Sequence, residues 1–169
     1  MSLRQAIKVK LYNILRTYRF KVIHPLLDPQ SQTLLDIGCA ELYFYHQLKS
    51  RFEITLADYE PQHELIQKED VQNLSFADRS FDIVLCQQVL EHVSNPVPAI
   101  QELRRVTRRQ LIITIPYEPF FTLARFCLWE KNHLWAITPK ALEHYLGKPT
   151  YERKIICKRY YVGVWTFNP

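Results

Sequence analysis

The sequence predicts a three-layer α/β/α sandwich, in which helices cover both faces of a mostly parallel β-sheet. Short apolar strands recur along the 169 residues, and amphipathic helices alternate with them. Strands that are apolar throughout are typical of a sheet that is covered on both faces. No repeat, linker or low-complexity tract divides the chain, and its length supports one hydrophobic core. We therefore expect a single domain over residues 1–169.

The first 27 residues differ from the rest of the chain in charge. They contain six basic residues and no acidic ones, whereas the rest of the chain has 16 basic and 17 acidic residues. Apolar residues recur there at the spacing of one helical face, at Leu3, Ile7, Leu11, Ile14, Tyr18 and Val22. The pattern predicts a basic cap helix within residues 1–27 that packs on the domain edge. The alternative is a helix that also contacts anionic lipid or a partner.

The composition excludes several classes of protein. Hydrophobic residues make up 47% and charged residues 23%, and no apolar run approaches the ~20 residues of a membrane span. The N-terminus has no apolar secretory core, so we expect no signal peptide and a cytoplasmic protein. The cysteines lie far apart without a C-x-x-C pair, at Cys39, Cys86, Cys127 and Cys157. This spacing argues against a zinc site and a disulfide framework and favours reduced thiols.

Two strands and one helix are expected in the first third of the chain. Residues 33–37 form a strand ended by Gly38, and residues 52–57 form a second strand that ends at Asp58. The helix between them is expected over 41–52, with its inward-facing residues at Leu42, Tyr45, Leu48 and Phe52.

The segment 58–70 is short for the topology. A parallel crossover needs about 12 residues or more, so this segment has room for a helix or a strand but hardly for both. We expect a stunted helix near 61–66 and a vestigial or missing third strand at the sheet edge.

A third clear strand is expected over 81–86 and a fourth over 111–115, where Pro116 closes it. Asn95 suits the N-cap of the helix between them, because Pro96 then occupies the first helical position. The core side of that helix is formed by residues at helical spacing, namely Ala99, Ile100, Leu103 and Val106.

The last third of the chain begins with an aromatic loop over 116–138, which contains Tyr117, Phe120, Phe121, Phe126, Trp129 and Trp135. Thr138 and Pro139 open a further helix, which Gly147 closes. Residues 151–167 are rich in aromatic and β-branched residues and are expected to form one or two strands at an antiparallel C-terminal edge of the sheet.

The predicted strand ends carry residues that suit a nucleoside. In an open parallel sheet, ligands bind beyond the carboxyl ends of the strands, where the winding reverses. Gly38 lets a ligand approach the backbone, and the carboxylate of Asp58, 22 residues after Asp36, can accept hydrogen bonds from both hydroxyls of a ribose. Asp70 and Val71 offer an acceptor and an apolar wall for adenine. The alternative is that both carboxylates are solvated loop acids.

A dinucleotide is a poor candidate for this site. Gly38 is the first glycine and the next is Gly147, so the G-x-G-x-x-G pattern is absent. The pyrophosphate of NAD requires several backbone amides at close range, whereas a sulfonium cofactor has no phosphate.

Three stretches resemble the class I, Rossmann-like methyltransferases that depend on S-adenosylmethionine: 33–48, 54–61 and 68–96. The phrase from Leu74 to Asp82, followed by Val89-Leu90-Glu91-His92-Val93, is the most specific part. The segment His133–Pro139 also resembles the branch that includes the ubiquinone and menaquinone biosynthesis methyltransferases. The resemblance covers roughly residues 30–147.

The resemblance implies a cofactor-binding role for eight residues. Asp36, Gly38 and Ala40 match the motif under the methionine portion of S-adenosylmethionine. Asp58 matches the acid that binds the ribose, and Tyr59 lies beside the adenosine. The remaining three matches are to the adenine-contacting pair, Asp70 and Val71, and to the position near the transferable methyl, Gln87.

The motif departs from the family pattern D-x-G-x-G-x-G at two positions. Ala40 replaces one glycine, and Leu42 places a bulky side chain where the chain usually passes close to the cofactor. These departures and the shortened segment 59–69 motivate an alternative hypothesis, in which a catalytically weakened domain acts as a binding or regulatory partner.

Methyl transfer from a sulfonium is an in-line displacement that leaves S-adenosylhomocysteine and requires no metal, so no metal site is expected. Proximity alone can contribute ~7–11 kcal/mol to such a reaction. A general base helps when the acceptor is a hydroxyl, and histidine is suited to that role near neutral pH. His92 and His133 are the candidates. The alternative for each is a structural histidine.

The motifs also argue against some classes of methyl acceptor. Amino-methyltransferases of nucleic acids carry N-P-P-Y or D-P-P-Y after the fourth strand of this fold, where this chain reads Cys86-Gln87-Gln88-Val89. None of the cysteines follows a proline, as the nucleophile of cytosine-C5 enzymes does. We therefore expect a small-molecule, lipid or sugar-derived acceptor, covered by the aromatic loop, with peripheral membrane contact through the basic helix. An RNA acceptor is less favoured, and the oligomeric state is not predicted.

Overall fold

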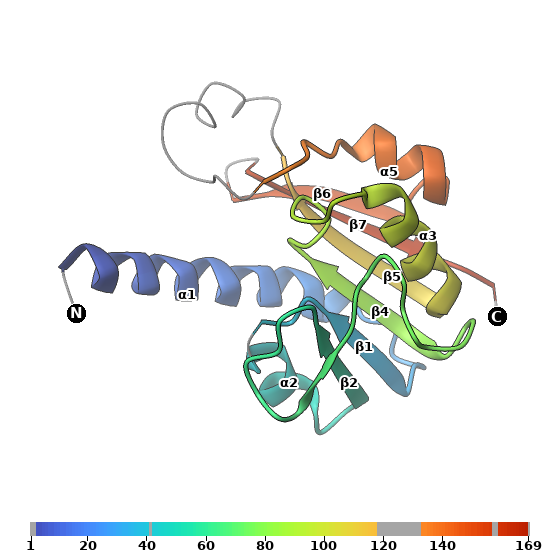
Figure 1. Cartoon of the computed structure of the whole chain (residues 1–169), viewed down its shortest axis with the longest axis horizontal. Helices are drawn as coiled ribbons and strands as arrows, with labels where there is room; N and C mark the ends of the chain where they lie inside the picture. The colour runs from blue at the N-terminus through green and yellow to red at the C-terminus, as the bar shows by residue number, and fades with distance from the viewer. Residues whose placement is uncertain (1–2, 41, 118–132, 157–158, 169) are drawn as a thin grey trace.

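A single seven-stranded sheet forms the centre of the molecule, with helices on both of its faces (Figure 1). The computed structural model describes residues 3–40, 42–117, 133–156 and 159–168. The strands are β1 (Thr33–Ile37), β2 (Glu53–Asp58), β3 (Ile66–Lys68), β4 (Phe81–Gln87), β5 (Thr107–Pro116), β6 (Tyr151–Ile155) and β7 (Tyr160–Thr166). The helices are α1 (Leu3–Ile23), the short η1 (His24–Leu26), α2 (Tyr43–Leu48), α3 (Pro96–Val106) and α5 (Pro139–Leu146).

The order of the strands is β3-β2-β1-β4-β5-β7-β6. The first five strands in this order are parallel, and β7 and β6 are antiparallel to their neighbours. The prediction of a mostly parallel sheet with an antiparallel C-terminal edge is therefore confirmed. The chain winds from β1 towards β3 in one direction and from β4 towards β5 in the other, so the carboxyl ends of β1 and β4 border the point where the winding reverses.

The apolar strands divide their side chains between two cores. In β4, Val84 and Cys86 pack with α3 and α5 on one face, while Ile83 and Leu85 pack with α2 and the end of α1 on the other. All four side chains are fully buried. Continuous apolarity in such a strand thus reflects burial on both faces, as the sequence indicated.

The helix boundaries of α3 and α5 follow from their capping residues. The side chain of Asn95 accepts a hydrogen bond from Val97 N–H, and Thr138 accepts one from Ala141 N–H. Gly147 closes α5 with a φ of 77°. Both helices and the four buried residues predicted for α3 are confirmed.

The region between β1 and β3 differs from the prediction in two ways. The helix predicted over 41–52 is only α2, Tyr43–Leu48, and Phe44 rather than the half-buried Tyr45 lies in the core beside Leu48. The short edge strand β3 was expected, but the helix predicted near 61–66 was wrong.

Side chains favour a turn there instead of a helix. His63 Nδ1 accepts a hydrogen bond from Leu65 N–H, and His63 O accepts one from Ile66 N–H. Such local bonds to the backbone compete with helix formation. The segment 59–65 therefore connects β2 to β3 through bends and a turn.

Helix α1 contacts the domain near its C-terminal end. Phe20 stacks edge-on against Tyr43 and Phe44 of α2, and Ile23 is fully buried. Further towards the N-terminus, the exposed fractions of Ile14 and Tyr18 are 56% and 43%. The helix extends outward from the sheet in Figure 1. Among the described helices, none combines the length and the apolarity needed to cross a bilayer.

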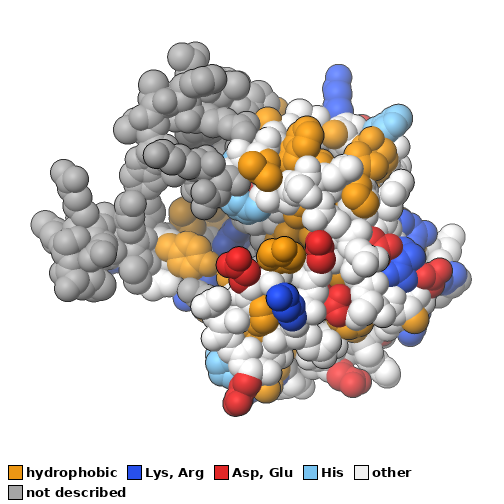
Figure 2. All heavy atoms as spheres, in the orientation of Figure 1, with side chains coloured by type: hydrophobic (Ala, Val, Ile, Leu, Met, Phe, Trp, Pro, Cys, Tyr) orange, Lys and Arg blue, Asp and Glu red, His pale blue; other side chains and the backbone are white. Residues whose placement is uncertain are grey.

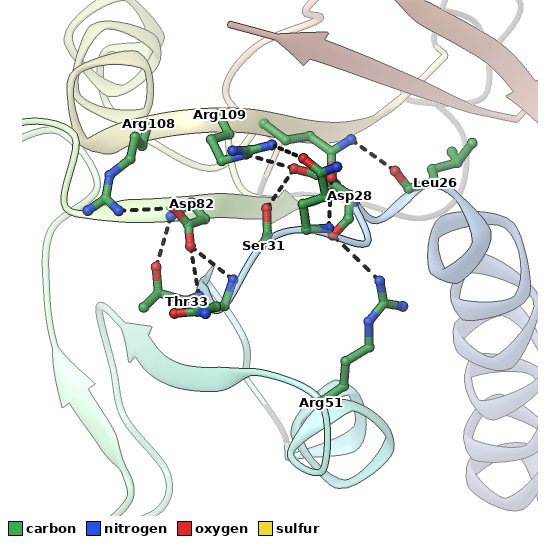
Figure 3. A network of polar contacts seen from close by, with 11 residues as sticks. Leu26, Asp28, Ser31, Thr33, Arg51, Asp82, Arg108 and Arg109 are labelled. Atoms are coloured by element: carbon green, nitrogen blue, oxygen red, sulfur yellow. Dashed lines mark hydrogen bonds and ion pairs between the residues drawn. The ribbon is translucent and has the colours of Figure 1, made fainter. Parts of the chain in front are cut away.

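Polar contacts join the amino-terminal ends of the central strands (Figure 3). Asp82 of β4 accepts hydrogen bonds from the backbone N–H groups of Gln32 and Thr33 and from Arg108 of β5. Burial alone would raise the pKa of Asp82, but these donors together lower it below its ordinary value. The carboxylate therefore ties three strands together.

A second carboxylate extends this network. Asp28 accepts hydrogen bonds from Ser31 and from Arg109, whose Nε lies 2.8 Å from Oδ2. Gln110 accepts a hydrogen bond from Asp28 N–H and donates one to Leu26 O. These polar groups at the amino-terminal ends of the strands thus form hydrogen bonds within the chain.

Replacing Asp82 should destabilise the fold. Asp82→Ala removes the acceptor of three hydrogen bonds and leaves two backbone donors partly buried, so we expect the free energy of unfolding to fall by roughly 2–4 kcal/mol. The measurement is urea unfolding, with Glu64→Ala, an exposed change, as the matched control. Equal midpoints for the two variants would contradict this role.

Candidate functional site at the carboxyl ends of the strands

A cavity of 590 Å³ lies at the carboxyl ends of the parallel strands. Its volume is within the roughly 300–1,000 Å³ of small-molecule sites. The lining residues follow the ends of β1, β2, β3 and β4, and they are Ile37, Gly38, Ala40, Asp58, Tyr59, Glu69, Asp70, Val71, Gln72, Gln88, Val89, His92, Val93 and Ser94. Six of the eight residues predicted to bind a cofactor therefore line one cavity, at the point where the strand order reverses.

The chain leaves β1 and β4 through backbone conformations that few residues adopt. Gly38, Ala40 and Gln88 have φ angles of 71°, 44° and 55°. A Cβ on Gly38 would lie 2.1 Å from Cγ2 of Val89, which is too close for two carbons. Gly38 is thus required both by its left-handed conformation and by the close approach of β1 to the segment after β4.

Asp58 holds the loop after β1 against the end of β2. Its Oδ2 accepts a hydrogen bond from Ala40 N–H at 2.9 Å, and its Oδ1 accepts one from Glu60 N–H at 3.0 Å. A carboxylate has about four acceptor positions, so each oxygen retains capacity for one more donor. The half-buried carboxylate lines the cavity and can accept hydrogen bonds from two neighbouring hydroxyls.

Asp70 and Val71, which follow β3 in the chain, form part of the cavity wall. Val71 is 5% exposed and belongs to the core that packs under α3. Oδ1 of Asp70 accepts hydrogen bonds from the backbone and side-chain nitrogens of Gln72, at 2.9 and 3.1 Å. Its Oδ2 makes only a 3.4 Å contact, which leaves this oxygen able to accept a stronger bond.

Gln72 is a site residue that sequence reasoning missed. Its amide nitrogen donates to Asp70, and its Oε1 accepts from Ser94 Oγ and Asn95 N–H, at 2.8 and 2.9 Å. Gln72 thus joins the turn after β3 to the start of α3, across 22 residues of sequence. No local sequence pattern signals a bridge of this length.

Asp36 lies behind the cavity rather than on its wall. It is 3% exposed within β1, between β2 and β4. Burial raises the pKa of Asp36 to about 7, Arg19 opposes the rise, and Asp58 adds to it. Burial and the same carboxylates raise the pKa of the neighbouring Cys39 thiol to about 12, which makes this thiol unreactive.

Two further predicted residues, Gln87 and Leu42, do not line the cavity. Gln87 ends β4, but its neighbour Gln88 lines the cavity, and Gln88 is held there by hydrogen bonds from its backbone and side-chain nitrogens to Thr114. Leu42 precedes α2 as its N-cap and is not among the described residues of the cavity wall.

The two candidate histidines lie together. His92 lines the cavity, and its ring centroid is 4.8 Å from that of His133. Of the aromatic loop, Tyr117 and Trp135 are described, whereas Phe120, Phe121, Phe126 and Trp129 lie outside the described residues. Trp135 Nε1 donates to Val93 O at 2.9 Å, and Tyr117 accepts a hydrogen bond from Lys154.

The segment from Leu74 to Asp82, which resembles the methyltransferase family most specifically, is held in place by contacts with α3. Arg105 of α3 donates hydrogen bonds to Leu74 O, Phe76 O and Asp78, and it pairs with Glu102 at 2.7 Å. These contacts fix the segment that leads into β4. Its residues therefore position the strand whose end reaches the cavity.

Comparison with known proteins identifies the central part of the chain. Residues 35–113, which run from β1 through β5, match the model of a family described as a methyltransferase domain. A solved S-adenosylmethionine-dependent methyltransferase from Archaeoglobus fulgidus has the same fold, with a TM-score of 0.75 and 15% identity over 98% of this chain and 100% of that one. This central part of the chain matches a methyltransferase domain, and the chain has the class I methyltransferase fold. S-adenosylmethionine is the cofactor of this class.

Two curated relatives of the chain are both named tRNA U34 carboxymethyltransferases. The protein from Nautilia profundicola is 26% identical over 166 residues, which cover 84% of this chain and 55% of the relative. The one from Campylobacter hominis is 28% identical over 105 residues, covering 51% of this chain and 36% of the relative. The chain thus spans about half the length of the first relative and about a third of the second.

The residues of the cavity wall fit S-adenosylmethionine. The cofactor carries a net positive charge, and the cavity wall contains the carboxylates of Asp58, Glu69 and Asp70. Val71 provides an apolar surface for a base, and Asp58 retains acceptor capacity for a ribose. Figure 2 shows acidic and hydrophobic side chains next to each other near the middle of the face that it presents.

The raised pKa of Asp36 should make stability depend on pH. The folded state holds the Asp36 proton up to about pH 7, whereas the unfolded state loses it near 3.8, so the native state binds more protons in between. The contribution of Asp36 to the free energy of unfolding should therefore fall as pH rises from 4 to 7, by at most about 1.4 kcal/mol per pH unit.

The measurement is urea unfolding at several pH values for the wild type and Asp36→Asn. Subtracting the two curves cancels the contributions of other groups, including Asp28 and Asp82. A difference that stays constant across this pH range would show that Asp36 ionises normally in the folded protein.

Proposed function

We propose that the chain transfers the methyl group of S-adenosylmethionine to an acceptor bound beside the cavity. One observation carries this proposal. Gly38 and Ala40, Asp58, and Asp70 with Val71 come from three different strand ends and line one cavity at the reversal of the winding. Ligands of open parallel sheets bind at this place.

Each part of the wall has a separate role in this proposal. Asp58 accepts hydrogen bonds from the ribose hydroxyls, and its existing bond to Ala40 N–H fixes its orientation beforehand. Val71 and Ile37 contact the adenine, and Asp70 accepts a bond from the adenine amino group. Tyr59, which is 63% exposed at the rim, covers the adenosine.

The bound cofactor supplies a methyl group on a sulfonium, which is open to in-line displacement. The chain contributes by orienting the reactants, since proximity alone lowers such barriers substantially. The buried Asp36 stabilises the cation through its field when it is ionised. Binding a cation therefore favours loss of the Asp36 proton.

The acceptor proposed is a small molecule, a lipid headgroup or a sugar-derived compound. Among the described residues of the cavity wall, three are acidic and none is Lys or Arg. A polyanionic acceptor usually meets a basic surface around the active site. The excess of basic over acidic residues lies instead in α1, which has six basic residues and no acidic ones, and this fits contact with an anionic membrane surface. Assignment to the ubiquinone and menaquinone branch remains part of this proposal.

Replacing Asp58 should weaken cofactor binding. Calorimetric titration with S-adenosylmethionine should show at least about tenfold weaker binding for Asp58→Ala than for the wild type, because two charge-assisted hydrogen bonds are removed. Glu64→Ala, an exposed change on the connection between β2 and β3, is the matched control. Circular dichroism verifies that each variant folds.

Two outcomes would contradict the proposal. Unchanged affinity of folded Asp58→Ala would remove the assigned ribose site. Failure of the wild type to bind at millimolar cofactor would favour the alternative of a domain that has lost turnover and acts as a binding or regulatory partner.

A tRNA acceptor is the second candidate, and the names of the two curated relatives favour it. This candidate predicts that tRNA binds with a steep dependence on salt, because Lys and Arg displace counterions from phosphates. Fluorescence anisotropy at several salt concentrations measures the slope. Replacing Arg4, Lys8 and Lys10 with Ser should reduce the slope by about one unit for each phosphate that is no longer neutralised. Absent or salt-independent binding would exclude this candidate.

A further inference from the structure

Three potential metal ligands gather beside the cavity. Glu91, His92 and His133 each offer one ligand atom, and these atoms all lie within 4.8 Å of one another. The Glu91 side chain is buried at 1% exposure, His133 is half-buried, and His92 is exposed and lines the cavity. The two imidazole rings meet edge to face, at an angle of 74°.

We propose that Glu91, His92 and His133 bind one divalent transition-metal cation at the rim of the cavity. Two imidazoles and one carboxylate suit zinc and its first-row neighbours, whereas magnesium and calcium prefer oxygen ligands alone. Three protein ligands leave positions for water or a substrate, as in catalytic sites. No metal was expected from the sequence, because methyl transfer requires none and the cysteines form no cluster there.

The distances between the ligand atoms are compatible with a shared ion. Nitrogen and oxygen ligands lie about 2.0–2.2 Å from such a cation, so two ligands of one ion are at most about 4.4 Å apart, and about 3.5 Å apart in a tetrahedral site. The observed upper limit of 4.8 Å exceeds the larger of these separations by a few tenths of an ångström. Binding an ion would require side-chain rotations that bring the ligand atoms closer together.

The backbone brings the three ligands together independently of any ion. Leu134 N–H and Trp135 N–H both donate to Glu91 O, at 2.8 and 3.3 Å. The indole of Trp135 donates to Val93 O at 2.9 Å. These bonds hold the segment that carries His133 against the turn that carries Glu91 and His92, across 42 residues of sequence.

The place of the cluster suggests what the cation does. His92 shares the cavity wall with Gly38 and Val89, which follow β1 and β4, and with Asp70 and Val71, which are proposed to contact the adenine. An ion there would hold an oxygen or nitrogen atom of the acceptor and favour its deprotonated form. Neither histidine would then act as the general base. This role rests on the proposed function, whereas metal binding itself does not.

Titration with the metal alone tests the site. Adding Co²⁺ to the full chain should give visible absorption bands that saturate at one equivalent, and Zn²⁺ should displace them. His133→Ala should weaken Co²⁺ binding at least about tenfold, while His144→Ala, an exposed histidine on α5 outside the cluster, should bind as the wild type does. Equal binding by His133→Ala and the wild type, or none by the wild type, would overturn the proposal.

X-ray absorption on the wild-type protein loaded with Zn²⁺ needs no variant and covers the case in which His133→Ala does not fold. Two imidazole ligands per ion are expected, and a spectrum without them would refute the site. Titration of the same sample with S-adenosylmethionine separates the two proposals. A chain that binds the cofactor but no metal overturns only the metal site, and one that binds metal but no cofactor overturns only the proposed function.

Discussion

A hydrogen bond from Ala40 N–H to Oδ2 of Asp58 joins the end of β1 to the end of β2, and the candidate site depends on it. The bond forms only because the chain turns through left-handed conformations at Gly38 and Ala40 after it leaves the sheet. Gly38 in turn must lack a Cβ, since Val89 fills that space. The cavity wall is therefore set by backbone geometry at one strand end and by a carboxylate at the next.

The carboxylates at the two ends of the parallel strands lie in different electrostatic environments. At the amino-terminal edge, the carboxylates of Asp28 and Asp82 are paired with arginines and backbone donors, which lower their pKa values. At the carboxyl-terminal edge, Asp36 is buried with a raised pKa, and Ala40 and Gln88 adopt strained conformations. Two of the four described non-glycine residues with a positive φ therefore lie where a ligand is proposed to bind, and the other two, Arg79 and Ile156, lie elsewhere.

Much of the fold follows from the sequence because local rules and tertiary packing agree. Apolar runs predict β1 and β4, and the capping side chains of Asn95 and Thr138 predict the starts of α3 and α5. The helix predicted near 61–66 was wrong because the side chain of His63 binds the backbone of a turn instead. The site residues at strand ends were predictable, since parallel strands bring their carboxyl ends together. Gln72 and the Glu91–His133 cluster depend on contacts between distant segments, which local patterns do not contain.

The most direct test of the proposed cofactor site is a crystal structure of the full chain with S-adenosylhomocysteine, the product of the proposed reaction. We expect the ribose hydroxyls to lie within hydrogen-bond distance of the Asp58 carboxylate and the adenine ring to lie against Val71. A ligand bound elsewhere, or one whose ribose points away from Asp58, would contradict the proposed site.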